Sequence, residues 1–496
     1  MFLLTVIRAQ KPLFWLLLSG IVLATLQFLY GRSLWLDEIS LANNVLQRDF
    51  VGLLLPLDNN QVAPILFLWV EKLLSMLIAD SDYSLKFFPY LLYIGALNLF
   101  YKLVQHRFQS IYIQFFCLAL FIFNGHLLNY SNEVKQYIGD VFVVTLFLYY
   151  YLCKTKNTKY YIEIALLGVF AILLSNTAII ILAVVGLSTV YEGVLQQKNT
   201  NTAFPTAIFG VGAVWLVSFA LYFYGFVYEH PTTAIMRVFW ANENAFLPKN
   251  PFSFAFIDFL RHQIEVIFQN LLGFGKIIGF FVCLPLFVLG LFSKQNTAKM
   301  LLSAPILLHL GLSALSLYPF NGRLILYIVP LLLLGIAEGA AFLVEKTAIK
   351  HFFEGQKRVF TPIFYLFILA LAGIFVFLNG FPIEKQAAKP CFAFIQQNMA
   401  ATDKIYIYYG GVAAFRFYTE NQKFSFSNEI IFGNSHRSET EKYMVDIAQI
   451  HGNVWVFFSH VHGDEEAFIL ERLQEKGFLP QKKLVTVGAS AYLYRL

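Results

Sequence analysis

The chain has 496 residues, of which 58% are hydrophobic and only 13% are charged. Soluble domains carry about 25% charged residues, so this composition excludes an ordinary soluble protein and indicates an integral membrane protein. The net charge of +6 is modest, and cytoplasmic anchoring residues explain it better than nucleic-acid binding does. The four cysteines are scattered and predict neither a disulfide framework nor a metal site: they are Cys117, Cys153, Cys283 and Cys391.

The first apolar segment, at about 12–31, is long enough to cross a bilayer and follows two basic residues. Basic residues beside a span favour the cytoplasmic side. We therefore expect a cytoplasmic N-terminus and a first outer loop at 32–84. Two adjacent carboxylates, Asp37 and Glu38, lie near the start of this loop. Carboxylates at a membrane edge are costly unless they are solvated, paired or functional, so a solvated acidic loop and a functional site both remain open.

The segment 65–79 has only 15 residues and carries two charges in its middle, so we interpret it as an amphipathic helix on the outer surface. Counting it as a span would reverse every later loop. Without it, alternate connections carry the lysines and arginines that favour the cytoplasmic side. The later spans are predicted at about 85–104, 111–130, 137–153, 160–175, 177–194, 203–226, 276–293, 300–318, 324–344 and 360–379.

Two further regions lie outside the predicted spans. The large outer loop at 227–275 contains amphipathic stretches that either cover an outer cavity or form a plain surface helix. Residues 383–496 are polar, with alternating strand-like and helix-like runs, and predict a small extracytoplasmic α/β domain. The predicted fold is thus an α-helical polytopic membrane protein, with about 11 transmembrane helices and outer juxtamembrane helices in 1–382.

This topology brings many polar residues to the outer face, several of them beside a helix end. Each has a structural alternative, such as a helix cap for Asn176, an interfacial anchor for Lys135 or a solvated loop for His230. Their convergence on one face nevertheless favours a polar site there. They are Asp37, Glu38, Asn59, Gln61, Asn132, Glu133, Lys135, Asn176, Glu229, His230, Arg237, Asn321 and Arg323.

Five short motifs occur in order over about residues 12–340. They are Leu36-Asp37-Glu38, Gln61-Val62-Ala63-Pro64, the run from Tyr130 to Tyr137 (YSNEVKQY), Ser175-Asn176-Thr177, and Asn321-Gly322-Arg323 followed by Pro330. In their order and spacing the chain resembles the membrane-embedded C-type glycosyltransferases that use polyprenyl-phosphate sugars. Within these enzymes it resembles the branch of the protein O-mannosyltransferases and the lipid A aminoarabinose transferase.

The chain also departs from this family at two motifs. Many relatives carry a basic residue or histidine before the proline of the second motif, where this chain has Gln61 and Ala63. Close relatives often carry aspartate at the position of Glu133. These differences leave the substrate and any metal requirement open.

The resemblance implies that a sugar moves from a polyprenyl-phosphate donor to an acceptor hydroxyl at the outer face. Such a transfer needs a base for the acceptor and cations for the leaving phosphate. We expect Asp37 to be the base, and Glu38 to hold a second proton, orient the acceptor or bind a cation. With one base and a phosphate leaving group, the reaction should invert the anomeric carbon.

The other expected site residues surround these two carboxylates. Lys135 and Arg323 suit a phosphate, the arginine through its bidentate fork. Further substrate-binding candidates are Glu133, Tyr137, Gln61 and Asn176, and candidate ligands for a divalent metal ion are Glu38, Glu133 and His230. No nucleotide cofactor is expected, because the sequence lacks a Walker motif and a dinucleotide-binding glycine loop.

The main alternative is a lipid-linked sugar flippase or other transporter, which should have midplane charges or paired half-repeats. A membrane-anchored binding protein is a third hypothesis, and it gives the many spans no function. The expected partners are the lipid-linked donor, a glycan, lipid or protein acceptor, and the bilayer, without nucleic acid. The expected location is the bacterial inner membrane, with the site and the C-terminal domain in the periplasm.

Overall fold

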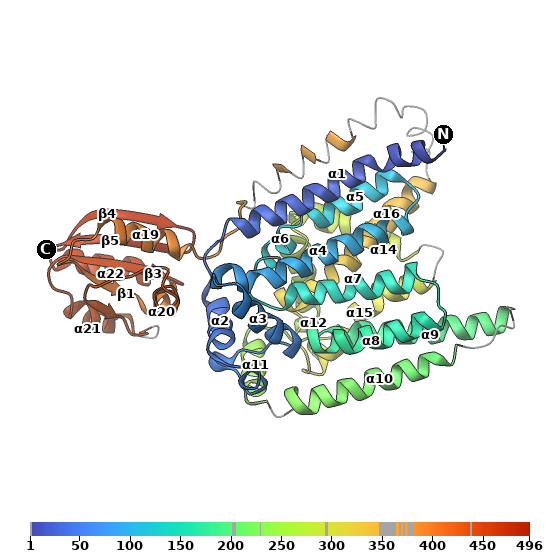
Figure 1. Ribbon diagram of the computed structural model, residues 1–496, viewed down its shortest axis with the longest axis horizontal. Helices are drawn as coiled ribbons and strands as arrows, with labels where there is room; N and C mark the ends of the chain where they lie inside the picture. Colours follow the sequence, from blue (N-terminus) through green and yellow to red (C-terminus); the bar gives the residue numbers. More distant parts are fainter. Residues whose placement is uncertain are drawn as a thin grey trace.

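The chain forms a large helical part and a smaller domain built on a β-sheet, which lies at one end of the helices in the computed structural model (Figure 1). The N-terminus of the first helix lies at the opposite end of the helical part. The structure describes residues 2–200, 205–228, 230–292, 296–346, 364–366, 369–370, 373–374, 378, 380–436 and 439–496.

Long apolar helices make up most of the helical part, as the composition predicts. Shorter helices, including α2 and α3, lie at the end that faces the sheet domain (Figure 1). The helices are α1 (Phe2–Leu29), α2 (Leu36–Gln47), α3 (Ile65–Leu77), α4 (Ser81–Arg107), α5 (Ile111–Ile122), α6 (Gly125–Tyr130), α7 (Tyr137–Cys153), α8 (Thr158–Leu174), α9 (Ala178–Thr200), α10 (Ala207–Tyr222), α11 (Pro231–Asn242), α12 (Phe254–Glu265), α13 (Lys276–Ile278), α14 (Leu284–Gly290), α15 (Asn296–Ala314) and α16 (Val329–Lys346).

Five helices among the described residues are long and apolar enough to cross a membrane. A sixth is added if Phe254–Leu271 and Lys276–Gly290, which bend by 118° at their junction, count as one broken span. The prediction of a polytopic helical membrane protein is thus confirmed, whereas the number of eleven spans stays a prediction. The last predicted span, 360–379, lies largely outside the described residues, as does Glu229.

Two of the predicted outer segments form helices. The segment that we interpreted as amphipathic forms α3, whose 13 residues are too few to span a bilayer. The predicted large outer loop contains α11 and α12. Its last part joins α12 to the bend of 118° between Leu271 and Lys276.

Helices α14 and α16 approach each other closely because three glycines lie at their contact. A Cβ atom added at Gly339 would lie 1.8 Å from the carbonyl oxygen of Leu286, and one added at Gly290 would lie 2.2 Å from that of Gly335. Gly335 and Gly339 are four residues apart and share one face of α16. This is the small-residue spacing that lets membrane helices pack backbone to backbone.

The C-terminal domain is a five-stranded sheet in the order β2-β1-β3-β5-β4. β1 runs parallel to β2 and β3, whereas β5 is antiparallel to β3 and β4. All six residues of the central strand β3 are buried, as its continuous apolar sequence predicts. The elements are α19 (Ala388–Asn398), β1 (Lys404–Ile407), α20 (Val412–Glu420), β2 (Ile430–Phe432), α21 (Tyr443–Ala448), β3 (Val454–Ser459), α22 (Glu465–Glu475), β4 (Leu479–Thr486) and β5 (Ala489–Arg495).

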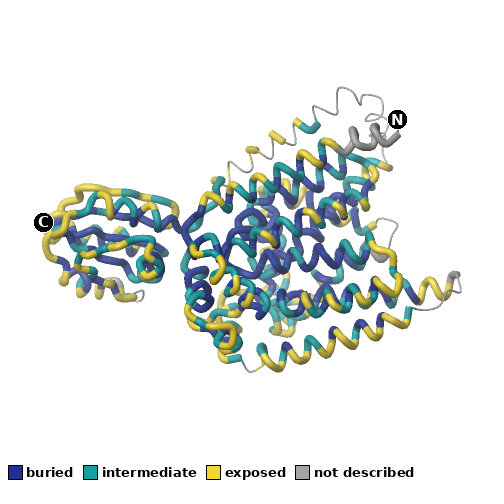
Figure 2. Tube along the Cα trace, in the orientation of Figure 1, coloured by how far each residue is buried: buried dark blue, intermediate teal, exposed yellow. Residues whose placement is uncertain are grey.

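The sheet domain packs against the first outer loop, where α20 contacts α2. Buried residues continue from the helical part through this junction into the sheet (Figure 2). Two ion pairs join the domain to the residues before α4 and in its first turn: Lys389 bonds to Asp82 at 2.6 Å and Lys423 to Asp80 at 2.5 Å. The junction is therefore a packed polar interface, and it lies beside the Asp37 motif.

Candidate active site

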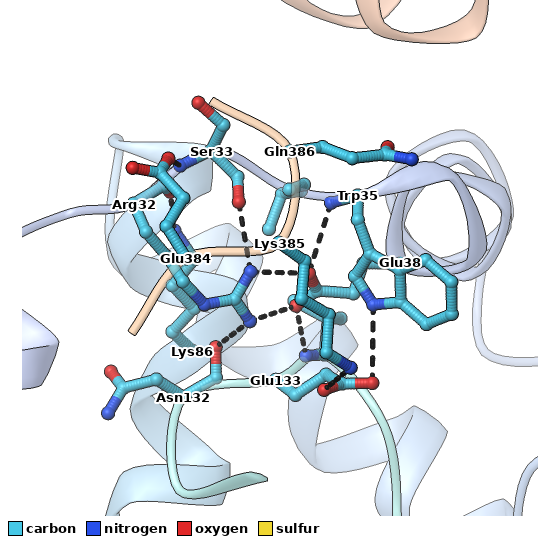
Figure 3. Close-up of polar contacts among 12 residues, drawn as sticks. Arg32, Ser33, Trp35, Glu38, Lys86, Asn132, Glu133, Glu384, Lys385 and Gln386 are labelled. Atoms are coloured by element: carbon cyan, nitrogen blue, oxygen red, sulfur yellow. Dashed lines mark hydrogen bonds and ion pairs between the residues drawn. The ribbon is translucent and has the colours of Figure 1, made fainter. Parts of the chain in front are cut away.

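A buried ion pair fixes the start of α2. The Nη1 and Nη2 atoms of Arg32 donate to the two carboxylate oxygens of Glu38 at 2.7 and 2.8 Å, and both side chains are fully buried (Figure 3). Glu38 also accepts from the backbone N–H groups of Trp35, at 3.1 Å, and Val134, at 2.7 Å. The bond to Trp35 is half of a capping box, in which the third residue of a helix bonds to its N-cap. Glu38 thus ties α2 to the loop before α7.

Asp37 points to a different side of α2, because successive helical residues are rotated by about 100°. Its Oδ2 atom lies 2.5 Å from Nη1 of Arg323, and the two side chains remain 29% and 24% exposed. The Arg323 guanidinium lies 5.6 Å from the Trp35 ring centre and 5.4 Å from that of Tyr137. Two aromatic rings thus hold the arginine beside the partly exposed carboxylate.

Lys135 is the second cation beside Asp37. It is 4% exposed and donates a 2.5 Å hydrogen bond to the amide oxygen of Gln61. Burial lowers the pKa of Lys135 to about 8, although the negative charge of Asp37 opposes this shift. Burial alone would raise the pKa of Asp37, but the charges of Lys135 and Arg323 outweigh it and hold that pKa below its usual value. The two groups are therefore ionised together at neutral pH.

Glu133 holds Trp35 through the N–H group of its indole ring. Its carboxylate accepts from the Trp35 indole N–H at 3.2 Å, the Asn129 amide at 2.9 Å and Lys385 at 2.6 Å. Lys385 lies 4.5 Å from the Trp35 ring centre and 5.1 Å from that of Tyr130. Glu133 is fully buried, whereas the Lys385 side chain is 31% exposed. The site thus includes a lysine from the start of the C-terminal domain.

Three ion pairs in this region match a carboxylate to a cation: they are Arg32–Glu38, Arg323–Asp37 and Lys385–Glu133. Among the ion pairs of the described residues, Lys135 has no carboxylate of its own, and its hydrogen bond goes to the neutral Gln61. A buried, unneutralised cation favours binding of an anion.

A cavity of about 200 Å³ lies next to this cluster. Gln61, which binds Lys135, is part of its wall, together with Asn176, Tyr222, His230 and several apolar side chains. The Tyr222 hydroxyl lies 3.3 Å from the Asn176 amide oxygen. The structure therefore groups Asp37, Lys135, Tyr137, Glu133 and Arg323 around Trp35, and places Asn176 and His230 at the neighbouring cavity.

The three candidate metal ligands do not converge. Glu38 is paired with Arg32, Glu133 with Lys385, and His230 caps α11 by accepting from the backbone N–H of Thr232 at 3.2 Å. Within the described part of the chain, no group of three histidine, cysteine, aspartate or glutamate side chains is arranged to hold a metal ion. The geometry gives no support to a metal site built from these residues.

Two residues with clear roles in this geometry were not assigned from the sequence. Arg32 lies only five residues before Asp37, and its charge beside two carboxylates was an available signal. Lys385 lies 252 residues after Glu133, in the region that we assigned to a separate domain. Its only sequence signal is the polar run Glu384-Lys385-Gln386 directly after the last predicted span.

Together, the fold and the site define a polytopic membrane protein with a carboxylate among cations at the end of its helices nearest the C-terminal domain. Neither a protein-family model nor a curated protein matches the sequence. One similar solved structure is ArnT from Cupriavidus metallidurans bound to undecaprenyl phosphate, with 12% identity, coverage of 96% of this chain and 97% of that chain, and a TM-score of 0.49.

A second is the archaeal oligosaccharyltransferase AglB from Archaeoglobus fulgidus, in complex with an inhibitory peptide and a dolichol-phosphate. Its identity is 11%, the match covers 96% of this chain and 74% of that chain, and the TM-score is 0.44. The apo form of the Archaeoglobus fulgidus enzyme matches with 12% identity over 97% of this chain and 74% of that chain, at a TM-score of 0.48. The chain is thus similar over most of its length to solved structures of ArnT and of an archaeal oligosaccharyltransferase.

Proposed function

We propose that this protein is a glycosyltransferase that moves a sugar from a polyprenyl-phosphate donor to an acceptor hydroxyl, with Asp37 as the general base. The observation that carries this proposal is the partly exposed Asp37 carboxylate beside Arg323 and Lys135. A carboxylate suits proton removal, and the cations suit a phosphate leaving group that gains negative charge in the transition state.

Donor binding itself can activate the base. In the free protein Arg323 is bonded to Asp37 at 2.5 Å, which keeps the carboxylate a weak base. A donor phosphate competes for the same guanidinium, which prefers a bidentate anion. When Arg323 bonds to the phosphate instead, its charge no longer holds down the pKa of Asp37. Burial then raises the proton affinity of that carboxylate. Asp37 then becomes a stronger base only when a donor is present.

The surrounding residues take supporting roles in this mechanism. Lys135 contributes the charge that no carboxylate neutralises, and the Tyr137 and Trp35 rings hold Arg323. Glu38 keeps the start of α2 in position through its four hydrogen bonds, so we assign it a positioning role instead of proton transfer. With one base and a phosphate leaving group, the proposed transfer inverts the anomeric carbon.

We assign the site and the C-terminal domain to the periplasmic side of a bacterial inner membrane. The support is the distribution of lysine and arginine among the connections, which favours a cytoplasmic N-terminus. A transporter of lipid-linked sugars is the second candidate, but it needs polar groups near the membrane midplane. The charges described here gather instead at one end of the helices.

Replacing the base tests the proposal. Asp37→Asn keeps the size of the side chain and should lower turnover by about 10²- to 10⁴-fold, the usual contribution of a positioned base. The assay supplies polyprenyl-phosphate hexoses and pentoses, radiolabelled in the sugar, together with glycan, lipid and peptide acceptors. It follows transfer of the label, with donor binding measured in parallel. Donor binding should be kept or strengthened, because Arg323 loses its competing carboxylate.

Asp58→Asn is the matched control, since Asp58 is an exposed carboxylate of the same outer loop and is 70% exposed beside Arg48. It should leave turnover within about twofold, as expected of a surface ion pair. Near-normal turnover in Asp37→Asn would refute Asp37 as the base. Absence of transfer by the wild-type protein with every donor of the panel would refute the glycosyltransferase assignment.

A further inference from the structure

A three-residue segment, Glu384-Lys385-Gln386, connects the C-terminal domain to the Asp37 motif; we call it the strap. Glu384 accepts from the backbone N–H of Ser33 at 2.9 Å, and Gln386 accepts from that of Leu36 at 3.1 Å. These bonds lie on either side of Trp35 and fix the strap along the residues that precede Asp37 (Figure 3). Lys385, between the two anchors, is thereby held over the site.

Lys385 lies near the same aromatic ring and the same carboxylate as Arg323. Both cations lie against the Trp35 ring, Lys385 at 4.5 Å and Arg323 at 5.6 Å from its centre. The positive charge of Lys385 also acts on Asp37. Its side chain is 31% exposed, although its ammonium group is bonded to the buried Glu133.

Attachment of the domain does not by itself require Lys385. Lys389 and Lys423 of the C-terminal domain form ion pairs with Asp82 and Asp80 of the helical part. The two strap anchors add backbone hydrogen bonds. Among the ion pairs described between the domain and the helical part, that of Lys385 is the one beside the Asp37 cluster.

We propose that Lys385 binds the phosphate group of the lipid-linked donor, as a third cation that the C-terminal domain supplies to the site. This deepens the function proposed above and rests on it. Lys385 keeps Glu133 neutralised in the free protein, and its three N–H donors allow it to bond to Glu133 and to a phosphate oxygen together. The C-terminal domain is then part of the donor site instead of a separate appendage.

The test measures binding of undecaprenyl phosphate to the full-length protein in lipid nanodiscs. Lys385→Ala should weaken the affinity by about 10- to 100-fold, as expected for loss of a hydrogen bond between charged groups. Lys385→Arg should stay within about 5-fold of the wild type, because it keeps the charge. The matched control Lys423→Ala removes an ion pair at the same interface, away from Asp37, and should change the affinity less than twofold.

Two further variants separate ligand binding from a structural role. Lys385→Gln can still donate to Glu133 but carries no charge, so it should bind as weakly as Lys385→Ala if the charge acts on the phosphate. In the double variant Lys385→Ala, Glu133→Gln no buried carboxylate is left unpaired. Recovery of wild-type affinity in this double variant would overturn the proposal, because Lys385 would then act only by neutralising Glu133.

The same experiment separates this inference from the function on which it rests. If the wild type binds undecaprenyl phosphate and Arg323→Ala weakens binding, but Lys385→Ala and Lys385→Gln bind normally, only the role of Lys385 is refuted. If the wild type shows no saturable binding, the proposed function fails first. The expected result is weakened binding in Arg323→Ala, Lys385→Ala and Lys385→Gln alike, with Lys423→Ala unchanged.

Discussion

Removing Arg32 should destabilise the protein strongly, although Arg32 lies outside the proposed catalytic step. Arg32→Met keeps much of the side-chain volume but leaves the fully buried Glu38 carboxylate without its cation. Breaking a buried ion pair in this way typically costs ~3–5 kcal/mol. The backbone N–H groups of Trp35 and Val134 still donate to Glu38, so we expect a value at the lower end of that range.

The exposed pair Arg48–Asp58 provides the matched control. Its N–O distance of 2.8 Å is similar to that of the buried pair, but its side chains are 21% and 70% exposed. Asp58→Asn removes this pair and keeps the bonds of Arg48 to the Gly52 and Pro56 carbonyls, so it should cost no more than about 1 kcal/mol. The free energy of unfolding is measured from tryptophan fluorescence during titration of the detergent-solubilised protein with sodium dodecyl sulfate. A loss of less than about 1 kcal/mol in Arg32→Met would refute the role given to this pair.

The dependence on pH gives a second check of the same pair. Burial alone would raise the pKa of Glu38, but the Arg32 charge outweighs it, so the folded-state pKa lies below the usual value of 4.5. The stability that comes from this depressed pKa is fully present above pH 4.5 and is lost as the pH falls through the folded-state pKa. In Arg32→Met, burial of Glu38 is unopposed by Arg32, and protonation relieves the buried charge. The difference in stability between wild type and variant should therefore shrink as the pH falls from 7 toward 5, and a constant difference would contradict this account.

Two further predictions concern the second cation and the helix contact. Burial lowers the pKa of Lys135 to about 8, so the lysine loses its charge as the pH rises from 7 to 9, and the affinity for undecaprenyl phosphate should fall by up to about tenfold. Lys135→Arg should remove this decline, and a wild-type affinity that stays constant over this range would show that Lys135 does not bind the phosphate. Gly339→Ala should lower the thermal midpoint, because its Cβ would lie 1.8 Å from the Leu286 carbonyl oxygen, and overpacking of this kind costs ~1–3 kcal/mol. Gly311→Ala in α15 is the control, since no atom lies within 4 Å of its added Cβ; an equal loss in both variants would contradict close packing of α14 against α16.

Periodicity and composition predict much of this fold because they report local properties. The apolar segments form helices, and the four strand-like runs form β1, β3, β4 and β5. The strand β2 was missed because Ile430–Phe432 has only three residues, too few for a pattern. The predicted span 276–293 begins with the second helix of a pair that bends by 118° between Leu271 and Lys276, and hydropathy does not reveal this change of direction.

The site could be predicted where its residues lie at helix ends that share one face. Asp37, Lys135 and Arg323 are brought together in this way. Adjacent carboxylates look equivalent in the sequence. That Glu38 is buried against Arg32 while Asp37 stays partly exposed depends on helix rotation and on the position of Arg32. Lys385 could not be predicted, because its position depends on how a distant domain docks.

The position of Lys385 also determines when the site can form. Ribosomes make the chain from its N-terminus, so Asp37, Glu133 and Arg323 are all synthesised before the strap. The Lys385–Glu133 bond joins residues 252 positions apart, and the strap itself is held by a domain whose last strand, β5, ends at Arg495. Insertion of the helices thus leaves Glu133 without this cation until the strap has been synthesised and has docked. A chain cut short before Lys385 would carry Asp37, Glu133 and Arg323 but would lack this lysine.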